Sequence, residues 1–162
     1  MRKIVKIIIF LTGVVLFLLL LLFSLPKQKL EISKVCFEES CFNVEVVSTP
    51  LERQKGLMFR DHLDKDQRML FVFNKEGDYP FWMKNTLIPL DIIWINQDLE
   101  VVFIKEDAEP CLSTETLAKE NHRSDCPLIN PNQKAKYVLE VDKGVVKDIN
   151  LKLGDKAFLD ID

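Results

Sequence analysis

The most regular pattern along the chain is a series of short apolar runs separated by polar turns. Runs rich in β-branched and aromatic residues, bounded by turn-forming residues, are typical of strands. We expect strands over residues 32–37, 42–47, 69–73, 81–83, 88–95, 99–104, 137–141 and 156–159. Many short strands at this spacing predict a mostly β fold, either a β-sandwich or a partly closed, jelly-roll-like barrel.

One or two short helices are expected among these strands. The first follows Thr49, because Thr at the N-cap, Pro50 at the first helical position and Glu52 at the third form a capping box. Gly56 should end this helix within two turns. A second helical turn or short helix is expected over residues 145–151.

The N-terminus carries a different pattern. Residues 7–25 are uncharged, and at helical rise they would span about 28 Å, close to the thickness of the bilayer hydrocarbon. Three basic residues precede the run, at positions 2, 3 and 6, which predicts a cytoplasmic N-terminus and an extracytoplasmic remainder. A cleaved signal peptide is the alternative, but it would have a shorter apolar core and a small-residue cleavage site.

This pattern divides the chain into three parts. We expect a transmembrane signal anchor over residues 1–25, a polar linker over 26–29, and an extracytoplasmic β domain over 30–162. The predicted location is therefore the cell membrane, with a single pass and the C-terminal domain outside the cytoplasm.

Four cysteines follow the predicted anchor. An even number of cysteines outside the cytoplasm favours disulfides, and neither pair has the C-x-x-C spacing of a metal site. Cys36 and Cys41 flank a short polar turn, so we expect them to pair across a hairpin. Cys111 and Cys126 should then close a longer loop. We expect no metal site and no cofactor.

The net charge of the chain after residue 25 limits the kinds of molecule that it is expected to bind. The chain after residue 25 has 25 acidic and 19 basic residues and no basic run. An acidic domain of this kind is a poor partner for nucleic acid.

The stretch from Pro80 to Trp94 raises the question of a binding site. Polar residues interrupt two apolar runs, and Asp91 lies inside the second run, where a desolvated carboxylate needs a cation or several hydrogen-bond donors. One interpretation is structural: a connection between strands and a satisfied carboxylate. The other is a pocket for a small polar or glycan-like ligand, with six candidate residues: Arg53, Arg60, Trp82, Lys84, Asn85 and Asp91.

These residues also carry a family resemblance. The segments Arg53–Arg60, Met69–Phe73 and Phe81–Asp91 resemble the DUF192 family, a prokaryotic domain of unknown function. The similarity continues through Cys111, Cys126, Val138–Val141, Gly144 and Gly154-Asp155. The resemblance implies a mostly β, compact barrel or jelly-roll-like domain, commonly exported or membrane-anchored. It implies no particular activity. In this chain Arg68 replaces the glycine usual before the Met-Leu-Phe strand, and the Cys36/Cys41 pair is particular to this chain.

Three functions fit the sequence. The first is a small-ligand or glycan-binding module of the cell envelope, which we favour over an enzyme. The second is an envelope hydrolase or lyase with Asp91 as acid/base and Arg53, Arg60 or Lys84 stabilising an anion. The third is a scaffold that docks an unidentified envelope protein through an exposed apolar surface.

Overall fold

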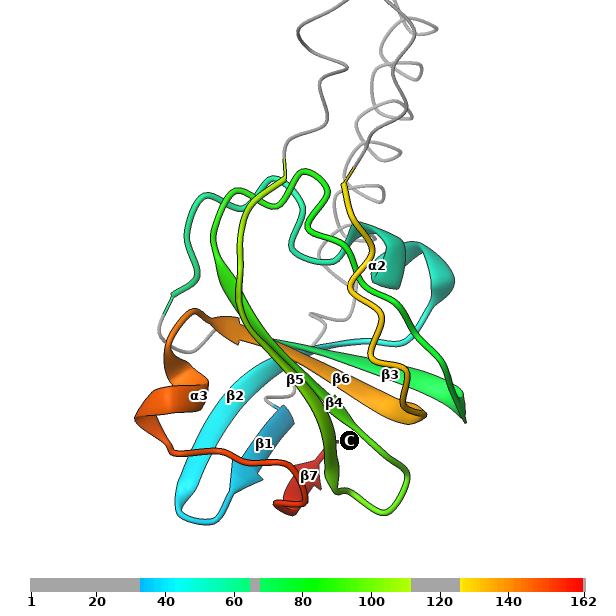
Figure 1. Ribbon diagram of the computed structural model, residues 1–162, viewed down its shortest axis with the longest axis vertical. Helices are drawn as coiled ribbons and strands as arrows, with labels where there is room; N and C mark the ends of the chain where they lie inside the picture. The colour runs from blue at the N-terminus through cyan, green and yellow to red at the C-terminus, as the bar shows by residue number, and fades with distance from the viewer. Residues whose placement is uncertain (1–32, 65–67, 112–125, 162) are drawn as a thin grey trace, which may run out of the picture. The chain divides into compact units, whose positions relative to one another are not determined.

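The computed structural model describes residues 33–64, 68–111 and 126–161 (Figure 1). The predicted anchor and linker lie outside these residues. Within the described ranges, no helix is both long enough and apolar enough to cross a membrane.

The described chain forms one seven-stranded sheet in the order β5-β4-β6-β3-β2-β1-β7. All neighbouring pairs are antiparallel except β2 and β3, which are parallel and are connected through α2. The strands are β1 (Ser33–Phe37), β2 (Ser40–Val47), β3 (Arg68–Gly77), β4 (Leu90–Ile95), β5 (Val101–Ala108), β6 (Ala135–Asp142) and β7 (Ala157–Asp160).

The sheet curls into a half-barrel, so the predicted mostly β fold is confirmed at this level. Its two edges meet at one end. There the Val101 amide donates to the Asp155 carbonyl at 2.9 Å, and the Ala157 amide donates to the Leu99 carbonyl at 2.8 Å. These bonds join the start of β5 to the start of β7 and satisfy backbone groups that an open edge would leave unpaired.

Three strand predictions need correction. Residues 81–83 form no strand; only single bridges occur there, between Phe81 and Ile129 and between Lys84 and Cys111. In addition, β3 and β5 extend farther along the chain than expected. Their polar ends pair with neighbouring strands, at Gly77 with Ala135 in β6 and at Ala108 with β4. Pairing partners distant in sequence therefore extend strands beyond the apolar pattern.

The first predicted helix is confirmed as α2 (Pro50–Lys55). The Glu52 amide donates to Thr49 Oγ1 at 3.3 Å, and the Thr49 amide donates to Glu52 Oε2 at 2.9 Å, which completes the capping box. Gly56 follows the helix with a φ of 46°. The second helix, α3 (Val145–Asp148), is a single turn.

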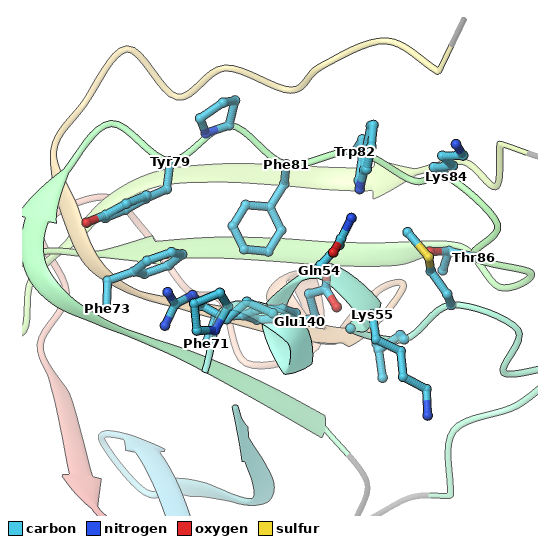
Figure 2. A pocket seen from close by; sticks show the side chains of 16 residues that line it. Gln54, Lys55, Phe71, Phe73, Tyr79, Phe81, Trp82, Lys84, Thr86 and Glu140 are labelled. Atoms are coloured by element: carbon cyan, nitrogen blue, oxygen red, sulfur yellow. The ribbon is translucent and has the colours of Figure 1, made fainter. Parts of the chain in front are cut away.

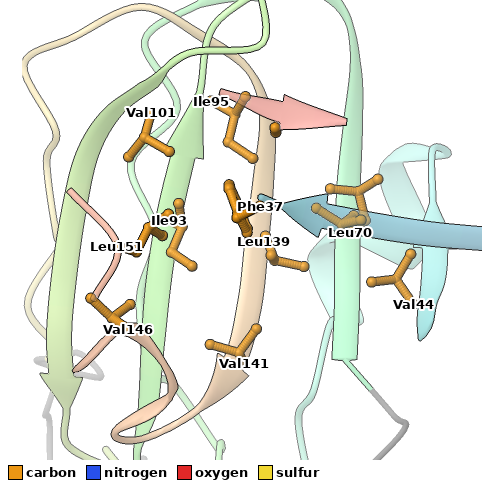
Figure 3. Close-up of a cluster of buried hydrophobic side chains, with 12 residues drawn as sticks. Phe37, Val44, Leu70, Ile93, Ile95, Val101, Leu139, Val141, Val146 and Leu151 are labelled. Carbon is orange, nitrogen blue, oxygen red and sulfur yellow. The ribbon is translucent and has the colours of Figure 1, made fainter. Parts of the chain in front are cut away.

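Two hydrophobic clusters lie on opposite faces of the central strands. In β4, Ile93 and Ile95 belong to the first cluster, which α3 covers through Val146 (Figure 3). Leu90, Ile92 and Trp94 belong to the second cluster, which also contains Leu57, just after α2. This division follows from the alternation of side chains along a strand.

Both predicted disulfides are present. Cys36 and Cys41 lie directly opposite each other in the β1–β2 hairpin. Cys111 and Cys126, which are 15 positions apart, join the two chain segments that flank residues 112–125. No described cysteine is free.

Candidate functional site

A pocket lies on the sheet face that carries the second hydrophobic cluster (Figure 2). It encloses about 320 Å³ between α2, the segment 79–86 and strands β3 and β6. Two groups of side chains dominate its lining. The aromatic group is Phe71, Phe73, Tyr79, Phe81 and Trp82. The basic group is Arg53, Lys55 and Lys84.

The aromatic wall is packed against the core. The Tyr79 ring stacks on Phe73 with centroids 3.5 Å apart. Phe81 makes edge-to-face contacts with Phe71 at 4.8 Å and with the fully buried Trp94 at 5.5 Å. Trp82 differs from these rings because 37% of its surface is exposed. The wall therefore combines rings that are buried or partly buried with one, Trp82, that is more exposed to solvent or a ligand.

Backbone hydrogen bonds hold the segment 79–86 in place. Phe81 and Ile129 exchange two bonds of 3.0 and 2.7 Å. Four residues on, the Asn85 amide donates to the Cys111 carbonyl at 2.7 Å, and the Cys111 amide donates to the Met83 carbonyl at 3.1 Å. The pocket wall is thus attached on both sides of the Cys111–Cys126 disulfide.

Two cations lie over aromatic rings of the pocket. The Arg53 guanidinium is 4.8 Å from the centre of the Phe73 ring, and its Nη1 also donates to the Val72 carbonyl at 3.0 Å and to the Ser48 carbonyl. The Lys84 ammonium is 5.5 Å from the centre of the Trp82 ring. Such geometry is favourable because the negative face of an aromatic ring attracts positive charge.

The pocket also contains a buried carboxyl group, that of Glu140 in β6. Glu140 is 5% exposed, and its sheet neighbours are Met69 in β3 and Ile92 in β4, both apolar. Its Oε2 atom is buried and has no hydrogen-bond partner. Figure 2 shows Glu140 and Gln54 below Phe81 and Trp82 and beside Phe71.

Burial controls the protonation of this group. Loss of solvation raises the pKa of Glu140 to about 8, and the positive charge of Arg60 opposes part of that effect. At neutral pH the group is therefore mainly a neutral carboxylic acid, which can donate one hydrogen bond as well as accept others.

The structure brings three of the six sequence candidates to this pocket: Arg53, Trp82 and Lys84. Arg60 does not line it and instead forms an ion pair of 2.5 Å with Glu45. Asn85 does not line it either; its backbone turns with a φ of 55°, and its carbonyl accepts from the Phe59 amide at 2.8 Å. Asn85 thus shapes the segment 79–86 through its backbone.

Asp91 lies away from the pocket. It is 1% exposed, and its two carboxylate oxygens accept three backbone hydrogen bonds. Oδ1 accepts from Asp107 at 3.0 Å, and Oδ2 accepts from Gly144 at 2.9 Å and Val146 at 3.0 Å. Asp91 therefore links β4 to the end of β5 and to the start of α3. This arrangement matches the structural interpretation, in which backbone amides satisfy a desolvated carboxylate, and it keeps Asp91 from acting as an acid/base in the pocket.

Glu140 was missed in the sequence interpretation. In the run 137–141 it reads as the polar position of a half-buried strand. The signal that could have revealed it is a carboxylate inside an otherwise apolar strand, the same signal that drew attention to Asp91. Across the described residues, no group of three or more His, Cys, Asp or Glu side chains is arranged to hold a metal ion.

Comparison with known proteins identifies solved structures of similar fold and a matching family. A solved structure from Novosphingobium aromaticivorans DSM 12444, a protein of unknown function, is 31% identical with a TM-score of 0.65, over 83% of this chain and 89% of that one. Another, from Sinorhizobium meliloti 1021 and described only as a candidate transcription regulator, is 28% identical with a TM-score of 0.64, over 78% and 91%. No match was found among curated proteins.

The family model that matches is DUF192, described as "Uncharacterized ACR", and the match covers residues 33–159. It includes every strand but the last residue of β7, together with the whole lining of the pocket. The chain belongs to the DUF192 family.

Proposed function

We propose that this protein is a membrane-anchored, extracytoplasmic domain that binds a small polar or glycan-like ligand in the aromatic pocket. One observation carries the proposal: a buried carboxyl oxygen of Glu140, without a hydrogen-bond partner, lies in the lining of a pocket walled by aromatic rings.

The energetics of burial support this role. A buried polar group without a partner costs about 1–3 kcal/mol relative to a satisfied one. Folded proteins satisfy most such groups, and an exception points to a missing partner. A ligand with a hydroxyl or another polar group would supply that partner, while Trp82 and its neighbours would cover an apolar face of the ligand.

The proposed location is supported by two independent features. Residues 7–25 are long and apolar enough to span a bilayer, and three basic residues, at positions 2, 3 and 6, precede them, against two in the linker that follows, at positions 27 and 29. The two disulfides between Cys36 and Cys41 and between Cys111 and Cys126 suit an oxidising compartment. The acidic charge of the chain after residue 25 argues against nucleic acid as the partner.

Ligand binding is tested with the full-length protein in detergent micelles. We would titrate it with a panel of mono- and disaccharides and follow binding by NMR and by thermal shift. We expect at least one sugar to bind wild type and to lose most of its affinity in Trp82→Ala. Phe158→Ala is the matched control, because Phe158 is an exposed aromatic residue that does not line the pocket. Equal loss in both variants, or no binding by any member of the panel, would count against the proposal.

Location is tested by protease treatment of intact cells or spheroplasts. The domain should be digested from outside, and the untreated protein should fractionate with the membrane. Recovery of full-length protein in the soluble cytoplasm would overturn this part of the proposal.

A further inference from the structure

The charge of the pocket differs from that of the surrounding domain. Although the chain after residue 25 has an excess of acidic residues, the Arg, Lys, Asp and Glu side chains that line the pocket are three cations and one carboxyl group. The cations are Arg53, Lys55 and Lys84, and the carboxyl group is the buried Glu140. A mainly protonated Glu140 leaves the pocket with net positive charge, which favours an anionic ligand.

Lys84 is the cation best placed to meet such a ligand. Arg53 already donates to the Ser48 and Val72 carbonyls, whereas Lys84 has no carboxylate partner in the part of the chain that the structure describes. Two other lysines of the domain do have carboxylate partners: Lys143 lies 2.6 Å from Asp107, and Lys156 lies 3.1 Å from Glu100. The Lys84 ammonium is instead held above Trp82, beside the pocket.

Glu140 adds a hydrogen-bond donor. A neutral carboxyl group can donate its proton to an oxygen of the ligand, and the bond is shorter and stronger when that oxygen is negatively charged. Because the Oε2 atom of Glu140 has no protein partner, no existing bond has to be broken.

The aromatic wall indicates the shape of the part of the ligand that does not carry the negative charge. Flat aromatic faces cover ring-shaped molecules that have an apolar face and polar edges, and Trp82 is the most exposed ring of the wall. A volume of about 320 Å³ lies at the small end of ligand pockets and limits the bound unit to one or two rings.

We propose that the ligand is an acidic sugar, in which Lys84 binds the carboxylate, Glu140 donates a hydrogen bond to it, and the sugar ring covers Trp82. This inference rests on the proposed function, since it names the class of ligand that the pocket takes.

The first test compares three sugars of similar size by calorimetry on the full-length protein in micelles at pH 7. The probes are glucuronic acid, which is anionic, glucose, which is neutral, and glucosamine, which is cationic. We expect glucuronic acid to bind at least tenfold more tightly than either of the others. Equal or tighter binding of glucose or glucosamine would overturn the acidic-sugar inference while leaving a sugar-binding pocket in place. If all three fail to bind while another sugar of the larger panel binds, this inference falls and the proposed function stands.

A pair of lysine variants isolates the role of charge. Lys84→Met should lower the affinity for glucuronic acid about tenfold and remove the preference over glucose. Lys136→Met is the control, because the Lys136 ammonium also lies over an aromatic ring, 5.6 Å from the centre of Tyr137, but does not line the pocket. Retained preference in Lys84→Met, or the same loss in Lys136→Met, would contradict the inference.

The pH dependence of binding tests Glu140. Its neighbours in the adjoining strands, Met69 and Ile92, do not titrate, and the charged groups that line the pocket from other elements are Arg53, Lys55 and Lys84. Arg60 does not line the pocket, but its positive charge acts on Glu140. Affinity for glucuronic acid should therefore fall at least tenfold from pH 7 to pH 9.5 as Glu140 becomes an anion, and Glu140→Gln should abolish that fall. An affinity that rises with pH would refute the inference.

Discussion

Among the described residues, two carboxyl groups are buried, and they lie on adjacent strands and face opposite sides of the sheet. Asp91 in β4 pairs with Val141, and the next residue, Ile92, pairs with Glu140 in β6. Since side chains alternate along each strand, this single-residue offset places the two carboxyl groups on different faces. Asp91 accepts three backbone hydrogen bonds, whereas Glu140 has a buried oxygen with none.

This difference in hydrogen bonding distinguishes a carboxylate that stabilises the fold from one that could bind a ligand. Both groups are almost fully buried, so burial alone does not separate them. The hydrogen-bond partners do: Asp91 joins three segments of the fold, while Glu140 lies in the lining of a pocket and stays incompletely bonded. Substitution should therefore weaken the fold at Asp91 and change binding at Glu140.

The largest expected effect on the free energy of unfolding comes from substitution of Asp91. Asp91→Ala leaves the amides of Asp107, Gly144 and Val146 without their acceptors, which should lower the free energy of unfolding by about 4 kcal/mol. Asp91→Asn should cost about 2 kcal/mol, because an amide nitrogen would then face one of the three donors. Chemical denaturation measures both values. An Asp91→Ala protein as stable as wild type would show that Asp91 does not stabilise the fold, and the contrast with Glu140 would be wrong.

The second effect is the pH dependence of stability at Glu140. Its pKa is raised from 4.5 to about 8 in the folded protein, so its contribution to stability is fully present below pH 4.5 and is lost as pH rises through 8. The free energy of unfolding should fall by about 3 kcal/mol between pH 5 and 9, less than the full linkage value because the folded protein relaxes around a buried anion.

Glu140→Gln provides the control for this pH dependence. It should be more stable than wild type by about 3 kcal/mol at pH 9 and within about 1 kcal/mol of it at pH 5. Subtracting the two pH profiles also removes the contribution of Asp142, whose pKa burial raises in the same direction. A variant that is less stable than wild type at pH 9 would show that Glu140 has a structural role like that of Asp91.

The third effect compares the two disulfides. In the chain-entropy model, a loop of 15 residues gives about 3 kcal/mol and one of 5 residues gives about 2 kcal/mol, so the serine variants should differ by about 1 kcal/mol. Only Cys111→Ser/Cys126→Ser should also weaken ligand binding, because Cys111 and Ile129 hold the pocket wall. Cys36→Ser/Cys41→Ser is the matched control, and an equal loss of binding in it would contradict this assignment.

The smallest expected effect is at the capping box of α2. Thr49→Ala removes the hydroxyl that accepts from the Glu52 amide and should cost about 1 kcal/mol, with Thr49→Ser as the control that keeps the oxygen. Since α2 carries Arg53, Gln54 and Lys55 into the pocket lining, binding should weaken as well. Thermal melts and sugar titrations of both variants measure the two effects, and a Thr49→Ser variant as impaired as Thr49→Ala would argue against the cap.

Local patterns were sufficient to predict much of this fold. The capping box at Thr49, the two disulfides and most strands depend on residues close in sequence or on simple pairing rules. The extra lengths of β3 and β5 and the loss of a strand at 81–83 depend on partners far along the chain. Glu140 escaped prediction for the same reason: it is buried because β6 lies between β3 and β4 in the sheet order, a non-local fact.

The two tryptophans of the chain have a practical consequence. Trp94 is fully buried, and its indole nitrogen donates to the Tyr79 carbonyl at 2.9 Å, whereas Trp82 is partly exposed in the pocket. Trp94 does not line the pocket and a ligand there would not touch it, while a sugar that covers Trp82 removes water from its ring. The intrinsic fluorescence of the unlabelled protein should therefore shift to shorter wavelength as the pocket fills, with Trp94 as an internal reference and Trp82 as the optical reporter.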